Sequence, residues 1–323
     1  MNRSQKTRTA AAAVYAGAIM FVFGAPLTQL FNYAMHNDVN SYVVLVPLIC
    51  AYILWIGRRN LGNPSRPAYR TGLGLALAAT FVWAMAMAFR PSPWMPERSD
   101  QLTLFTLSLV LFIWAGGSLF LGREWMRLAV FPMFFLIFMV PLPSVLVDAL
   151  ESASKVASAE AANIFFSITG TPTLRDGNVF MLPGITIEVA QECSGIRSSY
   201  VLILTSLVAG NLFLTRIWSR ILLVCFVIPL GIIRNGFRVW SIATLCIHMG
   251  PQMIHSVIHR RGGPVFFTLA LIPLLLFIWW LRSLERKRSL TVRSQPINSP
   301  SMPVLQPIAA PRIGDDSRNV RPS

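Results

Sequence analysis

The chain has 323 residues, of which 54% are hydrophobic and only 13% are charged, and it carries a formal net charge of +15. Soluble globular proteins contain about 25% charged residues, whereas here charges cluster between apolar runs of roughly 20 residues, the length that crosses a hydrocarbon core. An ordinary soluble protein is excluded, and a polytopic membrane protein is indicated. The Lys and Arg residues lie mainly in short loops and at the termini, without aromatic-interleaved basic stretches, so no nucleic-acid partner is expected.

Apolar runs predict an all-α fold, a polytopic transmembrane helical bundle with about eight spans. The predicted spans are residues 11–31, 39–57, 71–89, 102–121, 127–147, 196–214, 219–240 and 264–282. The first run is long for the hydrophobic region of a signal peptide, which has about 7–15 residues, so a retained helix is favoured.

Basic residues recur in every second connection, which assigns that side of the membrane to the cytoplasm and places both termini there. These residues are Arg3, Lys6 and Arg8; Arg58, Arg59, Arg66 and Arg70; Arg123 and Arg127; Arg216 and Arg220; and Arg282, Arg286, Lys287 and Arg288. Two regions follow, a transmembrane domain of residues 1–288 and a Pro- and Ser-rich cytoplasmic tail of residues 289–323 that is predicted to be disordered.

The longest external segment covers residues 148–192. Its first half, 148–168, is predicted to be an amphipathic helix on or near the outer membrane surface. In its second half, turn signals separate residues 178–182 from residues 185–189, which predicts a short β-hairpin. This hairpin either caps a site, binds an extended peptide or only connects two helices.

Cys193-Ser194-Gly195 opens the sixth predicted span. A helix N-terminus and the nearby cation Arg197 both favour the thiolate of Cys193, whereas Glu192 opposes it. The alternative, an inert structural cysteine, is disfavoured by these polar neighbours. Three other cysteines lie inside apolar runs and are expected to be small core hydrophobes, namely Cys50, Cys225 and Cys246.

Arg234, Asn235 and Arg238 interrupt the apolar sequence of the seventh span near its outer end. Ionisable groups at membrane depth are costly and usually mark function. The two arginines are four residues apart and share one helical face. Snorkelling to the headgroups remains an alternative for Arg234.

Histidines gather between the seventh and eighth spans, where His255 and His259 are four residues apart. No acidic residue accompanies them, so no metal or other cofactor is expected. A thiolate nucleophile, a histidine that activates it and protonates the leaving amine, and an arginine that stabilises an oxyanion make up a thiol peptidase or transpeptidase.

Three sequence blocks resemble the exosortase/archaeosortase family of polytopic membrane transpeptidases. The blocks are Glu192-Cys193-Ser194-Gly195-Ile196, then Ile228-Pro229 with Asn235-Gly236-Phe237-Arg238-Val239, then Gly250-Pro251 with His259 and Gly263. The resemblance implies that Cys193 is the nucleophile, Arg238 the conserved arginine and His259 the acid/base partner. Further residues are expected to support this site, namely Asn235, Arg234, Glu192, Ser194, Gly195 and His255.

The resemblance also implies the substrates. The family acts on secreted proteins with a C-terminal sorting signal, made of a short motif such as Pro-Glu-Pro, a membrane helix and a basic end. The enzyme removes this signal on the outer side of the bacterial inner membrane and joins the new C-terminus to an acceptor, often in organisms that export exopolysaccharide. The implied partners are therefore secreted proteins, membrane lipid and an acceptor molecule. Glu192 stands where the family commonly has a small residue, and Pro264 where it commonly has an aromatic one.

Two other functions fit the same sequence. A transporter or flippase for a lipid-linked glycan would use Arg234, Arg238 and the histidines to bind an anionic head group. A non-catalytic assembly protein of a polysaccharide export system would need none of these residues.

Overall fold

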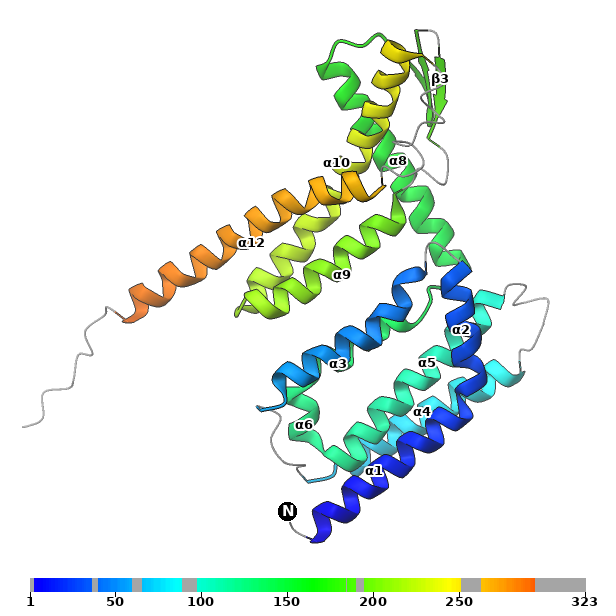
Figure 1. The fold of residues 1–323 in the computed structure, drawn as a ribbon, viewed down its shortest axis with the longest axis vertical. Coiled ribbons are helices and arrows are strands. Elements are labelled where there is room, and N and C mark those ends of the chain that lie inside the picture. Colours follow the sequence, from blue (N-terminus) through cyan, green and yellow to red (C-terminus); the bar gives the residue numbers. More distant parts are fainter. Residues whose placement is uncertain are drawn as a thin grey trace, which may run out of the picture.

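The computed structural model describes residues 3–36, 40–59, 66–88, 98–183, 185–189, 195–250 and 263–293. In these residues the chain forms long helices with a small β-sheet at one end (Figure 1). The predicted all-α transmembrane bundle with a short β-hairpin is therefore confirmed. The helices form two groups, which are joined through α9 (Ile196–Phe213).

The first helix group comes from the N-terminal part of the chain. Its elements are α1 (Arg3–Val22), α2 (Gly24–His36), η1 (Ser41–Val44), α3 (Leu45–Gly57), α4 (Tyr69–Ala88), α5 (Arg98–Gly116), the π turn η2 (Gly117–Leu121), α6 (Arg123–Leu128), α7 (Val130–Phe135) and η3 (Leu136–Met139). Its core is aromatic and aliphatic, with Phe23 and Phe135 fully buried.

The second group contains α9, α10 (Ile217–Met249) and α12 (Gly263–Arg293), whose shared core includes the buried Leu223 and Leu274. One side of α9 packs into the first group, where the Tyr200 ring stacks on that of Tyr42 at a centroid distance of 4.9 Å. Helix α9 is therefore packed between the two cores.

Helix α10 is the longest element, with 33 residues. It is about 50 Å long, whereas a hydrocarbon core is about 30 Å thick. Arg216 and Arg220 flank its first turn, as is typical of a helix end at the membrane boundary. The far end of α10 therefore extends beyond the predicted span at 219–240.

The described residues contain five helices that are long and apolar enough to cross a membrane. Two further pairs of helices pass the same test but are bent, by 61° between Ala10–Val22 and Gly24–His36 and by 91° between Val130–Met139 and Ser144–Ile168. Counting each bent pair as one span gives seven spans, and the predicted eight are reached only if the shorter apolar helix Ser41–Gly57 also crosses.

The predicted span at 127–147 is not one helix. The chain instead forms α6, α7 and η3, and then turns by 91° into α8 (Ser144–Ile168). Pro141 and Pro143 directly precede α8. Proline lacks an amide donor and disfavours the helical conformation of the residue before it, which explains why the helix stops here despite the apolar sequence.

The external segment contains an antiparallel sheet in the order β1-β2-β3, with β1 (Leu174–Asp176), β2 (Val179–Leu182) and β3 (Ile185–Glu188). Strands β2 and β3 are the predicted hairpin, with Phe180 opposite Ile187. Strand β1 was not predicted because its three residues, Leu-Arg-Asp, show no alternation of apolar and polar side chains. A turn at Gly177, with φ 59°, joins β1 to β2.

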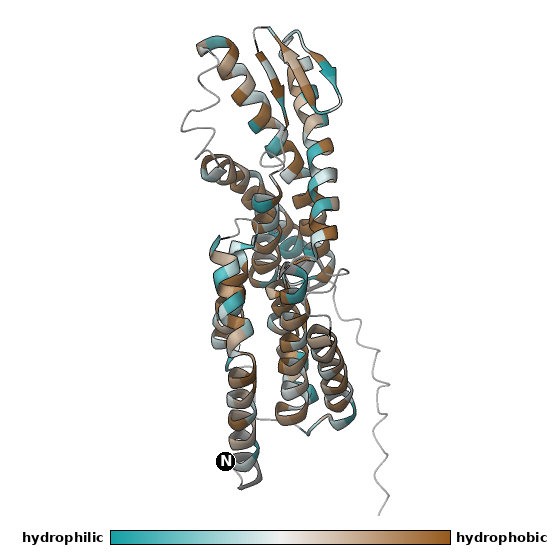
Figure 2. Cartoon of the chain, turned by 90° about the vertical axis from the view of Figure 1, so that its right-hand side faces the viewer, coloured by the Kyte–Doolittle hydropathy of each residue, from teal (hydrophilic) through white to brown (hydrophobic). Residues whose placement is uncertain are grey.

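Helix α8, the C-terminal half of α10 and the three strands form one unit, called the sheet lobe below. Small residues of α8 contact α10 closely, and a Cβ added to Gly236 would collide with Ala161. Phe166 and Phe180 fill the space between helix and sheet. The predicted helix at 148–168 is therefore present within α8, and it packs along α10. Figure 2 shows more hydrophilic residues in this lobe than along the bundle.

Two carboxylates cap the N-termini of the helices that form the lobe. Asp100, at the start of α5, accepts hydrogen bonds from Ser144 N at 2.9 Å and Ser144 Oγ at 3.1 Å. Glu285 of α12 accepts from Thr215 N at 3.0 Å, Thr215 Oγ1 at 2.8 Å and Arg216 N at 3.0 Å, directly before α10. The first amides of a helix have no partner within it, and the helix dipole attracts negative charge there. Each cap therefore stabilises one helix and joins it to a neighbour.

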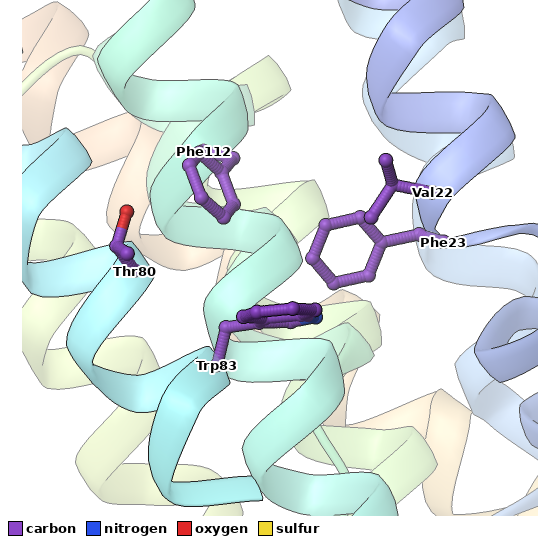
Figure 3. Close-up of a pocket in the computed structure, with 5 residues that line it drawn as sticks. All are labelled: Val22, Phe23, Thr80, Trp83 and Phe112. Carbon is purple, nitrogen blue, oxygen red and sulfur yellow. The ribbon is translucent and has the colours of Figure 1, made fainter. Parts of the chain in front are cut away.

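A small apolar pocket of ≈ 230 Å³ lies at the bend between α1 and α2. Figure 3 shows its lining side chains, which are Val22, Phe23, Thr80, Trp83 and Phe112. None of them is a predicted site residue.

One smaller prediction needs correction. Cys50 and Cys246 are buried as expected, but Cys225 is exposed on the surface of α10. Helix α12 continues to Arg293, and residues 294–323 lie outside the described residues, so the predicted division of the chain at residue 288 stays a prediction.

Candidate functional site

The described part of the predicted site consists of Gly195, at the start of α9, and Arg234, Asn235 and Arg238 on α10. The other predicted site residues lie outside the described residues, namely Glu192, Cys193, Ser194, His255 and His259. The following geometry concerns the four described residues and what holds them.

Gly195 is the N-cap of α9 and has φ 70° and ψ 9°, the left-handed conformation. A Cβ at this position would lie 2.5 Å from Asn235 Oδ1 and 3.0 Å from Arg234 Nη2. Only glycine adopts this conformation at little cost and also leaves room for the two α10 side chains. Gly195, which follows Cys193-Ser194 in the sequence, therefore packs directly against α10.

Arg234 is buried, with 6% of its surface exposed. Its Nη2 donates a hydrogen bond to the carbonyl oxygen of Gly195 at 3.3 Å. Its Nε and Nη1 are buried and have no hydrogen-bond partner among the described residues. The snorkelling alternative is therefore wrong, because the guanidinium points to the turn before α9 rather than to the headgroups.

Asn235 joins α10 to α8. It is 1% exposed, and its Nδ2 donates a hydrogen bond to Ser158 Oγ at 2.9 Å. Ser158 is also completely buried. Sequence reasoning did not select Ser158, because a serine in an Ala- and Ser-rich helix gives no sign of which side chain will be buried against a polar partner.

Close contacts of α10 with α9 and α8 fix the position of Arg234 and Asn235 between these helices. A Cβ at Gly231 would lie 2.9 Å from Ser199 Oγ on α9, and Gly236 faces Ala161 on α8 without room for a side chain. Glycines at 231 and 236 flank Arg234 and Asn235, so α10 approaches α9 on one side and α8 on the other. The polar pair is thereby held at the point where three helices meet.

Arg238 follows one helical turn after Arg234 on the same face. It is partly buried, and its Nε lies beneath the surface. Arg234 lies about 26 Å along the axis of α10 from Ile217, close to the full thickness of a hydrocarbon core of about 30 Å. Both arginines therefore lie in the half of α10 that is farther from Arg216 and Arg220.

The charges of the lobe are arranged separately. Two ion pairs occur among the described residues, Lys155–Glu188 at 3.5 Å and Arg175–Glu160 at 2.9 Å, and both join α8 to the sheet. No group of three or more His, Cys, Asp or Glu side chains in the described ranges is placed to hold a metal ion. The described cluster is thus a buried cationic and amide site suited to holding a backbone turn or negative charge.

Replacing Gly195 by alanine should destabilise the protein more than the same change at Gly170. Both glycines have positive φ, 70° and 66°, but a Cβ at Gly170 meets nothing within 4 Å. The left-handed conformation costs alanine about 1–2 kcal/mol at each position. At Gly195 the contact with Asn235 adds about 1–3 kcal/mol. Thermal unfolding in detergent measures both variants, and equal losses would contradict the packing described for Gly195.

A family model described as transmembrane exosortase matches residues 32–276, which is more than half of the chain. Comparisons with curated proteins and with solved structures found no match. The matched range includes the Cys193-Ser194-Gly195 turn and the polar face of α10. The resemblance of the three sequence blocks is thereby confirmed, and the chain belongs to the transmembrane exosortase family.

Proposed function

We propose that the chain is a cysteine peptidase or transpeptidase that cleaves the C-terminal sorting signals of secreted proteins. The cleavage takes place at the extracytoplasmic face of the inner membrane, and the new C-terminus is transferred to an acceptor. Family membership supports a membrane role in protein sorting. The nucleophile, its partners and the substrate are our inference from the residues and from the packing of α10.

One observation carries this proposal, namely the contact of Gly195 with Arg234 and Asn235. Consecutive Cα atoms are about 3.8 Å apart, so a residue two positions before Gly195 stays within about 8 Å of it. Cys193 is that residue. Chain connectivity therefore keeps the only cysteine of the Cys-Ser-Gly block close to the buried polar face of α10.

In the proposed reaction, the Cys193 thiolate adds to the carbonyl carbon of the scissile peptide bond. The tetrahedral intermediate collapses as the C–N bond breaks, and His259 gives the leaving amine the proton it took from the thiol. Arg238 holds the developing oxyanion. An acceptor amine or water then attacks the thioester and releases the thiol.

Arg234 has a different role in this scheme. Its guanidinium is directed to the Gly195 carbonyl oxygen, so it holds the turn that follows the nucleophile. Arg238 lies one turn further along α10, towards the residues that pack against the sheet, and is less buried, which suits contact with a substrate. The pair thus divides into a positioning residue and an oxyanion partner.

The site is proposed to face the outside of the cell, with both termini inside. In Figure 1, the N-terminal end of α1, helix α6 and the C-terminal end of α12 all lie away from the sheet. A membrane-impermeant thiol reagent should label Cys193 in intact cells when Cys50, Cys225 and Cys246 are replaced by serine. A cysteine placed at Arg220 should stay unlabelled until the cells are opened. Labelling of position 220 in intact cells would reverse the orientation.

Cys193→Ala should abolish removal of the C-terminal segment from a co-expressed secreted protein that carries a sorting signal. Cys225→Ala is the matched control, because this cysteine is exposed on α10 and should leave processing unchanged. Immunoblotting of the substrate with an antibody to its C-terminal end measures the loss. Normal processing by Cys193→Ala would instead favour the transporter or assembly functions.

Arg238→Lys should lower kcat by about 10²–10³-fold, the usual effect of removing one oxyanion donor. Lysine keeps the charge but loses the planar fork of donors. Arg234→Lys should be milder, because one ammonium can still donate to the Gly195 carbonyl. Processing rates in membranes at matched expression compare the two variants. A dead Arg234→Lys beside a nearly normal Arg238→Lys would show that the roles are reversed.

A further inference from the structure

Strand β3 has an open edge. Val189 N donates to Asn178 O at 3.0 Å, and Phe180 pairs with Ile187. Directly opposite residues of an antiparallel pair alternate between hydrogen-bonded and non-hydrogen-bonded pairs. Ile187 therefore directs its amide and carbonyl towards β2, whereas those of Thr186 and Glu188 point away from the sheet. Within the described part of the chain, no backbone hydrogen bond reaches these groups.

The open edge is held in place rather than loose. Ile185 and Ile187 pack on the core of the sheet lobe, and the buried Val189 ends the strand. The side chains of Thr186 and Glu188 are exposed, and Glu188 is paired with Lys155 of α8. The strand is thus extended and anchored on one face, which leaves it ready to pair without much further loss of conformational freedom.

The opposite edge of the sheet is less suitable. By the same alternation, Asp176 pairs with Val179 through hydrogen bonds, which leaves Arg175 as the one residue of β1 whose backbone groups point outward. The Arg175 side chain is already engaged with Glu160 and lies over the Phe180 ring at 5.6 Å. Strand β3 therefore offers more donors and acceptors than β1.

Position along the chain connects this edge to the site. Strand β3 ends at Glu188, and the Gly195 turn on Arg234 and Asn235 follows within a few residues. Cys193 lies in the short segment between them. Cys193 lies five residues after the end of β3, so chain connectivity keeps the proposed nucleophile within about 18 Å of a partner paired with this strand.

We propose that the open edge of β3 binds the substrate polypeptide next to its scissile bond as an added β-strand. Amides and carbonyls repeating every second residue are complementary to an extended backbone, and main-chain hydrogen bonds then give affinity with little dependence on side chains. This inference rests on the proposed function, because it names how that substrate is held.

Thr186→Pro tests the proposal, because proline removes the outward amide without breaking a bond to β2. The residue before proline favours the extended conformation that Ile185 already has. The substrate is a purified secreted protein that carries a sorting signal. We expect its KM to rise about 5- to 10-fold with kcat little changed, because one hydrogen bond to the substrate is lost. Leu174→Ala, at an exposed residue of β1 outside the proposed contact, is the control and should stay within about twofold of wild type. An unchanged KM in a folded Thr186→Pro variant overturns the proposal.

Photo-cross-linking is a second test of the proposal, and it needs neither a folded Thr186→Pro variant nor processing that depends on Cys193. A photoreactive residue at Thr186 or Glu188 in the Cys193→Ala protein should capture the sorting-signal protein. The same residue at Leu174, which is exposed on β1, is the control and should not. Capture at 186 and 188 supports strand addition whatever the outcome of the Cys193 experiment. Equal capture at 174, or none at any position, overturns it.

Discussion

The candidate site depends on the contact of Gly195 with the side chains of Arg234 and Asn235. It combines a left-handed glycine, a buried guanidinium and a buried amide, and each needs the others. A side chain at 195 has no room, and a cation at 234 without a carbonyl to bind is costly to bury. Asn235 extends the contact to Ser158 on α8. These contacts thereby fix the start of α9, the middle of α10 and helix α8 relative to one another.

Much of the fold could be predicted from sequence because the membrane imposes strong constraints. A helix that crosses lipid must satisfy its backbone internally and present apolar side chains, so each span is a visible run of apolar residues. The hairpin at 178–189 was also predictable, because turn residues bracket two short apolar segments. The prediction of one span at residues 127–147 was wrong because this segment has the apolar composition of a span, whereas the prolines before α8 end the helix.

The site was predictable in part. Reactive residue types in an apolar sequence stand out, so Arg234, Asn235 and Arg238 could be singled out as a group, and their role in a site stays a prediction. Their arrangement was not predictable, because burial of Arg234 depends on how closely α10 approaches α9 and α8. That approach is set by Gly231 and Gly236, and glycines in an apolar helix do not reveal which neighbour they admit. Ser158 shows the same limit, since its role comes only from the partner across the helix interface.

The carboxylate caps have a consequence for how this chain can be divided. Asp100 belongs to the first helix group but caps α8, which begins the sheet lobe. Glu285 lies near the end of α12 but caps α10, which starts some seventy residues earlier. Each helix of the lobe thus takes its first-turn partner from a distant part of the sequence. The sheet lobe is therefore interlaced with the N-terminal helix group rather than modular. Exchanging that group for one without an acidic residue at position 100 would preserve the apolar spans yet remove the charge on which α8 relies.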